Sequence, residues 1–148
     1  MVRISYPTQD FRIREKDDKE QIFDAFRKQW VRLTPEEWVR QNILQYLVQT
    51  RQYPASLIAI EKEIALGDLR KRFDILVYHR NTPWMVIECK EMSVPITESV
   101  LRQALHYNIS LQTKYLVITN GVEVFVFSLK EGKAEMEEEF PGYPEMAE

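Results

Sequence analysis

The sequence has few of the residues that build disulfides, phosphate loops or membrane spans. Its 148 residues include one cysteine and four glycines. A single cysteine permits no internal disulfide, which agrees with a reducing compartment. No Gly-x-x-x-x-Gly-Lys-Ser/Thr segment is present, which excludes an ATP-driven motor of the phosphate-loop type. No apolar run approaches the roughly 20 residues that span a bilayer, and the charged N-terminus lacks a signal peptide's apolar stretch. We therefore expect a cytoplasmic protein with no membrane partner.

Hydrophobic residues make up 45% of the chain, enough to bury one core. We expect a single domain over residues 1–130 and an acidic tail over residues 131–148. The tail holds seven acidic side chains and one lysine, a net charge of −6, so the rest of the chain carries +3. This charge permits a polyanionic partner without requiring one. Pro141, Gly142 and Pro144 predict that the tail is loosely packed.

Hydrophobic periodicity predicts alternating helices and strands. Helices are expected over residues 19–31, 35–49 and 97–110, and strands over residues 56–65, 73–78, 84–89, 115–119 and 122–127. Thr34, Pro35 and Glu37 form a capping box with proline at the first helical position. Asn120-Gly121 is typical of a two-residue hairpin turn. The helix between the strands at 84–89 and 115–119 makes those strands parallel. The predicted fold class is an α/β sandwich with a mixed central sheet flanked by helices.

The most informative feature is an acidic pair in two adjacent strands. Arg80-Asn81-Thr82-Pro83 supplies a turn between them, and with Asn81 near the apex Asp74 lies directly opposite Glu88. Side chains alternate along a strand, so Glu88 and Lys90 share a face and Cys89 points to the other. Two facing carboxylates repel each other and need a compensating cation, which Mg²⁺ or Mn²⁺ supplies. The alternative is that Lys90 forms a structural ion pair with Asp74 or Glu88.

An acid on one strand followed by Glu-X-Lys on the next resembles the signature of the PD-(D/E)XK nuclease superfamily. More narrowly, the chain resembles the N-terminal nuclease domain of type I restriction enzyme R subunits. The resemblance rests on residues 34–41, Tyr53-Pro54, residues 71–74, residues 87–90, and Gln103 with Tyr107. The superfamily's nominal proline before the first acid is Phe73 here. The resemblance implies a restriction-endonuclease-like sandwich. Type I R subunits also carry an ATP-driven translocase, and the missing phosphate loop sets this chain apart from that motor.

The resemblance also assigns roles. Asp74, Glu88 and the carbonyl of Cys89 would hold the metal, Lys90 would position or deprotonate water, and Gln103 would orient water or substrate. Glu37 would bring a third acid, although helix capping explains it equally well, and Glu36 is the alternative. Glu61 and Glu63 are lesser candidates for the site.

Contacts to nucleic acid are expected from six side chains. The cluster on the strand before Asp74 suits phosphate, although a solvated loop would use the same residues. On the first helix, Arg40 either contacts phosphate or faces solvent. Without the resemblance, Tyr107 would be an ordinary helix-surface residue. The full set is Arg40, Gln41, Arg70, Lys71, Arg72 and Tyr107.

These observations predict a Mg²⁺-dependent deoxyribonuclease of the endonuclease type. One alternative is a non-catalytic module of the nuclease fold that binds nucleic acid or a protein of a restriction complex. Another is a small structural subunit that completes such a complex. DNA is the expected partner. Many such nucleases cut duplexes as dimers, so we also consider a homodimer, although no pattern in the sequence indicates one.

Overall fold

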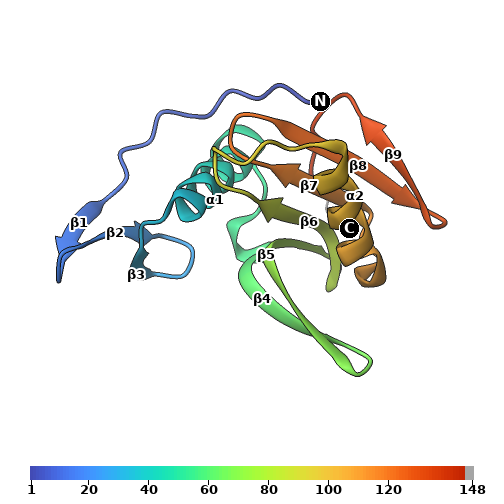
Figure 1. The fold of residues 1–148 in the computed structure, drawn as a ribbon, viewed down its shortest axis with the longest axis horizontal. Helices are drawn as coiled ribbons and strands as arrows, with labels where there is room; N and C mark the ends of the chain where they lie inside the picture. The colour runs from blue at the N-terminus through green and yellow to red at the C-terminus, as the bar shows by residue number, and fades with distance from the viewer. Residues whose placement is uncertain (146–148) are drawn as a thin grey trace.

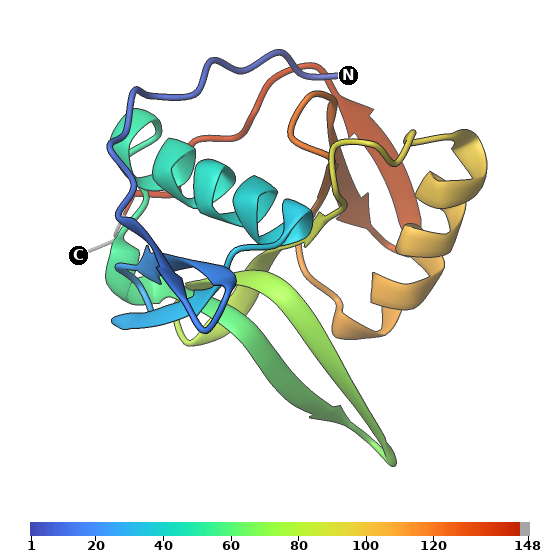
Figure 2. The same cartoon turned by 60° about the vertical axis from the view of Figure 1, so that its left-hand side comes forward.

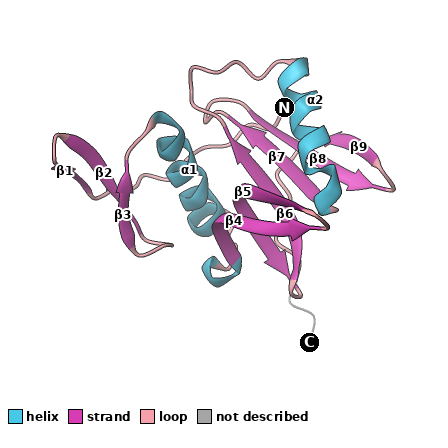
Figure 3. Ribbon diagram, turned by 60° about the horizontal axis from the view of Figure 1, so that its bottom comes forward, coloured by secondary structure: helices cyan, strands magenta, loops and turns pink. Residues whose placement is uncertain are grey.

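The computed structural model describes residues 1–145, and its main feature is a six-stranded sheet in the order β4-β5-β6-β7-β8-β9. A separate three-stranded sheet, β1-β2-β3, lies beside the first helix (Figure 3). β6 and β7 are parallel, as predicted for strands joined by a helix, and the other neighbours are antiparallel. In chain order the elements are β1 (Ile13–Lys16), β2 (Lys19–Asp24), β3 (Gln29–Arg32), α1 (Pro35–Gln45), β4 (Ile58–Leu66), β5 (Leu69–His79), β6 (Thr82–Cys89), α2 (Glu98–Asn108), β7 (Tyr115–Thr119), β8 (Val124–Lys130) and β9 (Lys133–Glu137).

The two long helices cover opposite faces of the six-stranded sheet (Figure 1). On one face, Ile43 and Leu47 belong to the core cluster that contains Ile75 and Ile87. On the other face, Ala104 belongs to a second cluster with residues of alternate position in the same strands, including Leu76, Val86 and Leu116. The predicted α/β sandwich with a mixed central sheet is therefore confirmed.

Helix α1 begins where the capping box predicts. Thr34 Oγ1 accepts a hydrogen bond from the Glu37 backbone N–H at 3.0 Å, and Pro35 occupies the first turn. The α-helix ends at Gln45 and continues as one π-helical turn over Tyr46–Thr50, close to the predicted end at residue 49.

The helix predicted over residues 19–31 is wrong, because this segment forms β2 and β3. Phe23 lies directly opposite Trp30, with ring centroids 5.5 Å apart, and the Arg12 guanidinium covers the Phe23 ring at 4.6 Å. Asp24 Oδ1 accepts from the backbone N–H groups of Phe26 and Arg27 and so closes the turn. The apolar spacing fits a helix as well as a hairpin, and the cross-strand aromatic pair decides for the hairpin.

The Asn120-Gly121 turn also differs from the prediction. Thr119 pairs with Val124, so the connection spans four residues and not two, and β8 begins two residues later than expected. Asn120 Oδ1 accepts from the backbone N–H groups of Val122 and Glu123, a local bond that competes with strand pairing.

The acidic segment is more ordered than the sequence predicts. β9 pairs with β8, so the sheet continues past the boundary expected at residue 130. Phe140 is 5% exposed and packs edge-on against Tyr46, with ring centroids 5.3 Å apart. The expectation of loose packing is therefore wrong for Lys133–Glu137 and for the buried Phe140, while residues 146–148 of the predicted tail lie outside the described residues. Within residues 1–145, no helix has both the length and the apolar character that a membrane span requires.

Candidate active site

The hairpin of β5 and β6 sets the positions of the acidic pair. Ile75 lies opposite Ile87, and Val77 lies opposite Met85, which is the predicted register. Asp74 precedes Ile75 and Glu88 follows Ile87, so the two acids lie directly beyond the last regular pair of the hairpin. Asp74 Oδ2 accepts a hydrogen bond from the Cys89 backbone N–H at 2.8 Å, which holds its carboxylate against β6.

Lys90 follows β6 directly and lies beside Glu88. Its Nζ is 3.0 Å from Glu88 Oε2, and the Lys90 side chain is 36% exposed. The Cys89 side chain points to the opposite face and is buried in the core under α1, as strand alternation predicts. The thiol is therefore turned away from the acids, and only the Cys89 carbonyl is available to them.

These residues line a cleft of about 400 Å³ between the sheet and α2. The cleft combines residues from both helices and both strands of the acidic hairpin, and most of the predicted catalytic set is among them. The lining residues are Glu36, Arg72, Asp74, Glu88, Cys89, Lys90, Val100, Gln103, Ala104 and Tyr107.

The carboxyl group of Asp74 ionises less readily in the cleft than in water. Burial raises the pKa of Asp74 from 3.8 to about 6, and the negative charges of Glu36 and Glu88 add to this rise. The Cys89 N–H and the Arg40 guanidinium oppose it. Burial lowers the pKa of Lys90, but its hydrogen bond and charge pairing with Glu88 outweigh that effect, so the pKa is raised. Lys90 is therefore an ammonium at neutral pH.

Glu37 does not line the cleft and is instead the centre of a buried arginine cluster. Its oxygens accept from Arg27 Nη2 at 2.9 Å, from Arg40 Nη2 at 3.0 Å and from Gln41 Nε2 at 3.0 Å. Glu37, Arg40 and Gln41 are each 5% exposed or less. The structure therefore places Glu37 outside the cleft lining and buries Arg40 and Gln41 beside it. The metal role expected for Glu37 and the nucleic-acid contacts expected for Arg40 and Gln41 remain predictions. Glu36, the alternative to Glu37, is the α1 carboxylate in the cleft.

Arg40 links this cluster to the acidic pair. Its Nη1 lies 3.4 Å from Asp74 Oδ1, and its Nη2 lies 3.2 Å from Glu61 Oε1. Glu61 is the β4 residue opposite Asp74, and its backbone has a φ of +52° in the middle of the strand. Non-glycine residues in this conformation are uncommon and concentrate at functional sites. Glu61 was a lesser candidate from the sequence, where no pattern reveals its backbone conformation.

The two predicted residues of α2 both line the cleft. Gln103 lines the cleft, and the Tyr107 hydroxyl donates to the Arg72 carbonyl at 3.4 Å. Lys71 Nζ donates to the Tyr107 carbonyl at 2.7 Å and lies 4.5 Å from the Tyr107 ring centroid. Lys71 thus joins β5 to α2, whereas Arg70 and Arg72 are mostly exposed, at 77% and 65% of their side chains.

Sequence reasoning missed Asn108. This residue is 1% exposed, and its Nδ2 donates to the Ala104 carbonyl at 2.7 Å and reaches Glu88 Oε1 at 3.5 Å. Its spacing of four residues from Ala104 places it on the face of α2 that meets the cleft, which was the available signal.

The donor set fits Mg²⁺, although it is sparse. Within the described residues, no group of three or more His, Cys, Asp or Glu side chains has the arrangement of a metal site. Two carboxylates, Asp74 and Glu88, and the Cys89 carbonyl are oxygen donors of the kind that Mg²⁺ prefers. Mg²⁺ is commonly held by one or two carboxylates, with water and substrate phosphate completing its shell, so this set suffices.

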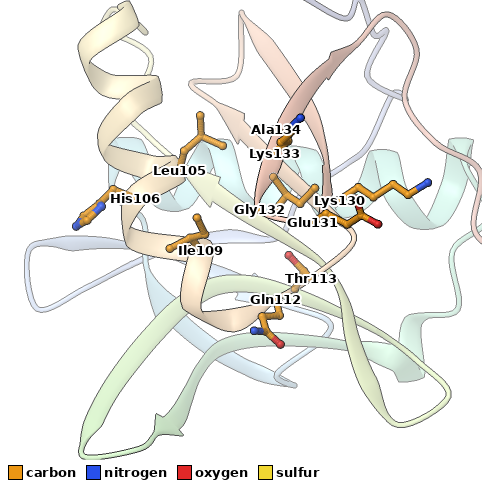
Figure 4. A pocket seen from close by; sticks show the side chains of 11 residues that line it. Leu105, His106, Ile109, Gln112, Thr113, Lys130, Glu131, Gly132, Lys133 and Ala134 are labelled. Carbon is orange, nitrogen blue, oxygen red and sulfur yellow. The ribbon is translucent and has the colours of Figure 1, made fainter.

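A larger hollow, of about 580 Å³, lies between the end of α2 and the β8–β9 hairpin (Figure 4). Leu105, Ile109 and Leu129 give it an apolar wall, and Lys130 and Lys133 lie on the hairpin side. Its single carboxylate, Glu131, cannot reproduce the acidic pair of the smaller cleft.

Comparison with known protein families agrees with the geometry. A model described as "Type I restriction enzyme R protein N terminus (HSDR_N)" matches residues 35–141. The matched segment includes every residue that lines the cleft and excludes β1, β2 and β3. A search of curated proteins found no match. Because the family model covers most of the chain, the protein belongs to the family of type I restriction enzyme R protein N-terminal domains.

Proposed function

We propose that this protein is a Mg²⁺-dependent deoxyribonuclease of the PD-(D/E)XK type that hydrolyses DNA phosphodiester bonds internally. The observation that carries the proposal is the convergence of Asp74, Glu88 and Lys90 in one cleft, from two adjacent strands. The family supports a role in restriction, with DNA and other restriction-complex subunits as partners.

The protein residues divide the work by charge. Asp74, Glu88 and the Cys89 carbonyl would hold the ion. When bound, Mg²⁺ or Mn²⁺ lowers the pKa of a water molecule and offsets charge on the phosphoryl oxygens. Glu36 adds a further acid at the α1 side of the cleft.

Lys90 acts as a cation in this scheme. Since pairing with Glu88 keeps its amine protonated, Lys90 donates hydrogen bonds that orient the attacking water and stabilise the anion that develops on phosphate. Gln103, on the α2 side, orients water or substrate. Arg72 also lines the cleft and offers its guanidinium to an adjacent phosphate.

The test is cleavage of linear, circular and single-stranded DNA with added Mg²⁺ or Mn²⁺. Asp74→Ala and Lys90→Ala should each abolish metal-dependent cleavage while leaving the circular dichroism spectrum unchanged. Lys130→Ala, which removes a lysine distant in the fold, is the matched control and should cleave as the unaltered protein does. Retained cleavage in the Lys90→Ala protein would refute its assigned role.

A second function is favoured by one observation: both carboxylates already have a protein cation. Arg40 lies beside Asp74, and Lys90 lies beside Glu88. Such neutralisation suits a non-catalytic module that keeps the fold to bind DNA or a restriction-complex subunit. Titration calorimetry with Mg²⁺ or Mn²⁺ separates the two functions. A nuclease should take up metal in a manner that Asp74→Asn abolishes, whereas a binding module should take up none.

A further inference from the structure

The β4–β5 hairpin projects well beyond the rest of the molecule (Figure 2). Its outer half runs from the Lys62–Phe73 pair to the tip, where Leu66 pairs with Leu69 across the turn at Gly67 and Asp68. We call residues 62–73 the arm. Most of its side chains are exposed, including Leu69, a large apolar residue, at 61%.

The arm is turned over relative to the sheet from which it extends. Ile58 and Ile60 of β4 pack on the α1 side, whereas Ile64 and Leu66 pack on the α2 side, although an unbroken strand would send all four the same way. The positive φ of Glu61 marks the point at which the faces exchange. The partner strand changes faces beside it, because Ile75 packs on the α1 side and Phe73 on the α2 side.

Because the arm changes faces at Glu61, its base packs against α2 on one side. The opposite face of the arm is exposed to solvent. On the α2 side, Phe73 packs edge-on against Tyr107, with centroids 6.1 Å apart, and Lys71 Nζ donates to the Tyr107 carbonyl. On the opposite face Arg70 pairs with Ala65, and Arg72 pairs with Glu63 in the strand register. All four of these residues are exposed. A two-stranded ribbon therefore presents arginines to solvent.

We propose that the arm binds in the major groove of duplex DNA and positions the duplex across the cleft. This inference rests on the proposed function and names the form of DNA that the site accepts. A major groove about 12 Å wide admits a two-stranded ribbon. The arm carries Lys62, Arg70, Lys71 and Arg72 against Glu63 and Asp68, a net positive charge that suits phosphate.

The chemistry at the tip suits base edges as well as backbone. Arg70 can donate two hydrogen bonds to guanine, and the exposed Leu69 can contact a thymine methyl group. Glu63 lies beside Arg70 on the exposed face of the arm, with Arg70 Nη1 3.1 Å from Glu63 Oε1.

The distance along β5 sets the reach of this contact. Leu69 precedes Asp74 by five residues on one strand, which at about 3.3 Å per residue spans about 17 Å. DNA rises about 3.4 Å per base pair, so the tip contacts the groove up to about five base pairs from the bond that is cut. Arg72 lies between the two points and lines the cleft.

The test compares two hairpins of the same chain. Binding to a duplex of about 30 base pairs, long enough for the site, and to one of its single strands is measured in the Lys90→Ala protein so that the DNA stays intact. The arm variant is Leu69→Ser with Arg70→Gln. The control is Lys130→Gln with Lys133→Gln at the β8–β9 tip, which removes more charge.

We expect the arm variant to bind the duplex about tenfold more weakly and the control to bind within about twofold of the parent. Because Arg70 is assigned to a base edge and not to phosphate, the salt dependence of the arm variant should change by less than about one unit of slope. Bulky glucosyl groups in the major groove should weaken the parent and leave the arm variant unchanged. Equal losses in both variants, absence of duplex binding by the parent, or preference for the single strand would each overturn the proposal.

The outcomes also separate this inference from the proposed function. Arm-dependent duplex binding without metal-dependent cleavage would leave the arm assignment intact and remove the nuclease. If the protein with native Lys90 cleaves DNA and the arm substitutions do not change that cleavage, the nuclease proposal stands and the arm assignment is overturned. If the same substitutions instead abolish binding of a restriction-complex subunit, the arm belongs to a protein partner.

Discussion

The backbone N–H of Cys89 donates to Asp74 Oδ2 at 2.8 Å, across the β5–β6 pair. This bond fixes the carboxylate by the strand itself, so its position does not depend on a bound ion. The same residue that orients Asp74 buries its own thiol under α1. The strand register therefore sets the positions of Asp74 and Glu88. Burial and the neighbouring charges set the pKa of Asp74.

The stability of the protein should depend on pH through Asp74. Burial raises the pKa of Asp74 from 3.8 to about 6, so the unfolded chain releases this proton first as pH rises. The native state is consequently destabilised between these two values, by up to about 3 kcal/mol once both states are ionised. Asp74→Asn is neutral throughout, so its unfolding free energy should improve relative to the parent between about pH 4 and about pH 7.

Urea denaturation at a series of pH values, with divalent ions chelated, measures this difference. Asp68→Asn, in the exposed turn between β4 and β5, controls for the loss of one negative charge. A difference between Asp74→Asn and the parent that stays constant with pH would contradict the assignment, whatever its size.

Adjacent glutamates of α1 should have opposite phenotypes. Glu37→Ala removes the buried carboxylate that accepts from both Arg27 and Arg40, and loss of one partner of a buried ion pair typically costs about 3–5 kcal/mol. Glu36→Ala, in the cleft, should change stability by less than about 0.5 kcal/mol but weaken Mg²⁺ uptake. Chemical denaturation and calorimetry on the two variants give both quantities. Equal destabilisation by the two substitutions would contradict the placement of Glu37.

The acidic hairpin was predictable because local signals agree there. The strand runs at 73–78 and 84–89 are long and β-branched, and the register counted from Asn81 holds at Ile75, Leu76 and Val77. Arg80 and Asn81 both have positive φ, as a two-residue turn of this kind requires. A shift of one residue between Val77 and Tyr78 absorbs the turn without disturbing the acidic pair.

The parts that sequence reasoning missed depend on contacts distant along the chain. Glu36 and Glu37 are equally acidic neighbours, and Glu37 is the buried one because Arg27, from the turn between β2 and β3, joins Arg40 and Gln41 in binding it. Residues 19–31 carry apolar spacing that fits both periods, and Trp30 selects the strand by packing on Phe23. The face exchange at Glu61 has no sequence signal, since glycine would be the expected residue at its φ.

Two glycines with positive φ should respond differently to alanine. At Gly121, φ is +92°, and an added Cβ would lie 3.3 Å from Val39 Cγ2 of α1. At Gly132, φ is +76°, and an added Cβ would meet open space. Both substitutions carry the backbone penalty of about 1–2 kcal/mol, and only Gly121→Ala adds crowding against the helix. Thermal denaturation should show the lower midpoint for Gly121→Ala, and the reverse order would contradict the close approach of α1 to this loop.

The C-terminal segment should contribute to folding through the buried ring of Phe140. Phe140 is 5% exposed and packs between Tyr46 and Tyr53, and Tyr53 Oη donates to the Pro141 carbonyl. Phe140→Ala should therefore lower the free energy of unfolding by about 3–5 kcal/mol, as expected for loss of a buried aromatic ring. Met136→Ala, a 45% exposed position in β9, should cost less than about 1 kcal/mol. Urea denaturation of both proteins provides the comparison, and a neutral Phe140→Ala would show that the Phe140 ring is dispensable for the core that supports the cleft.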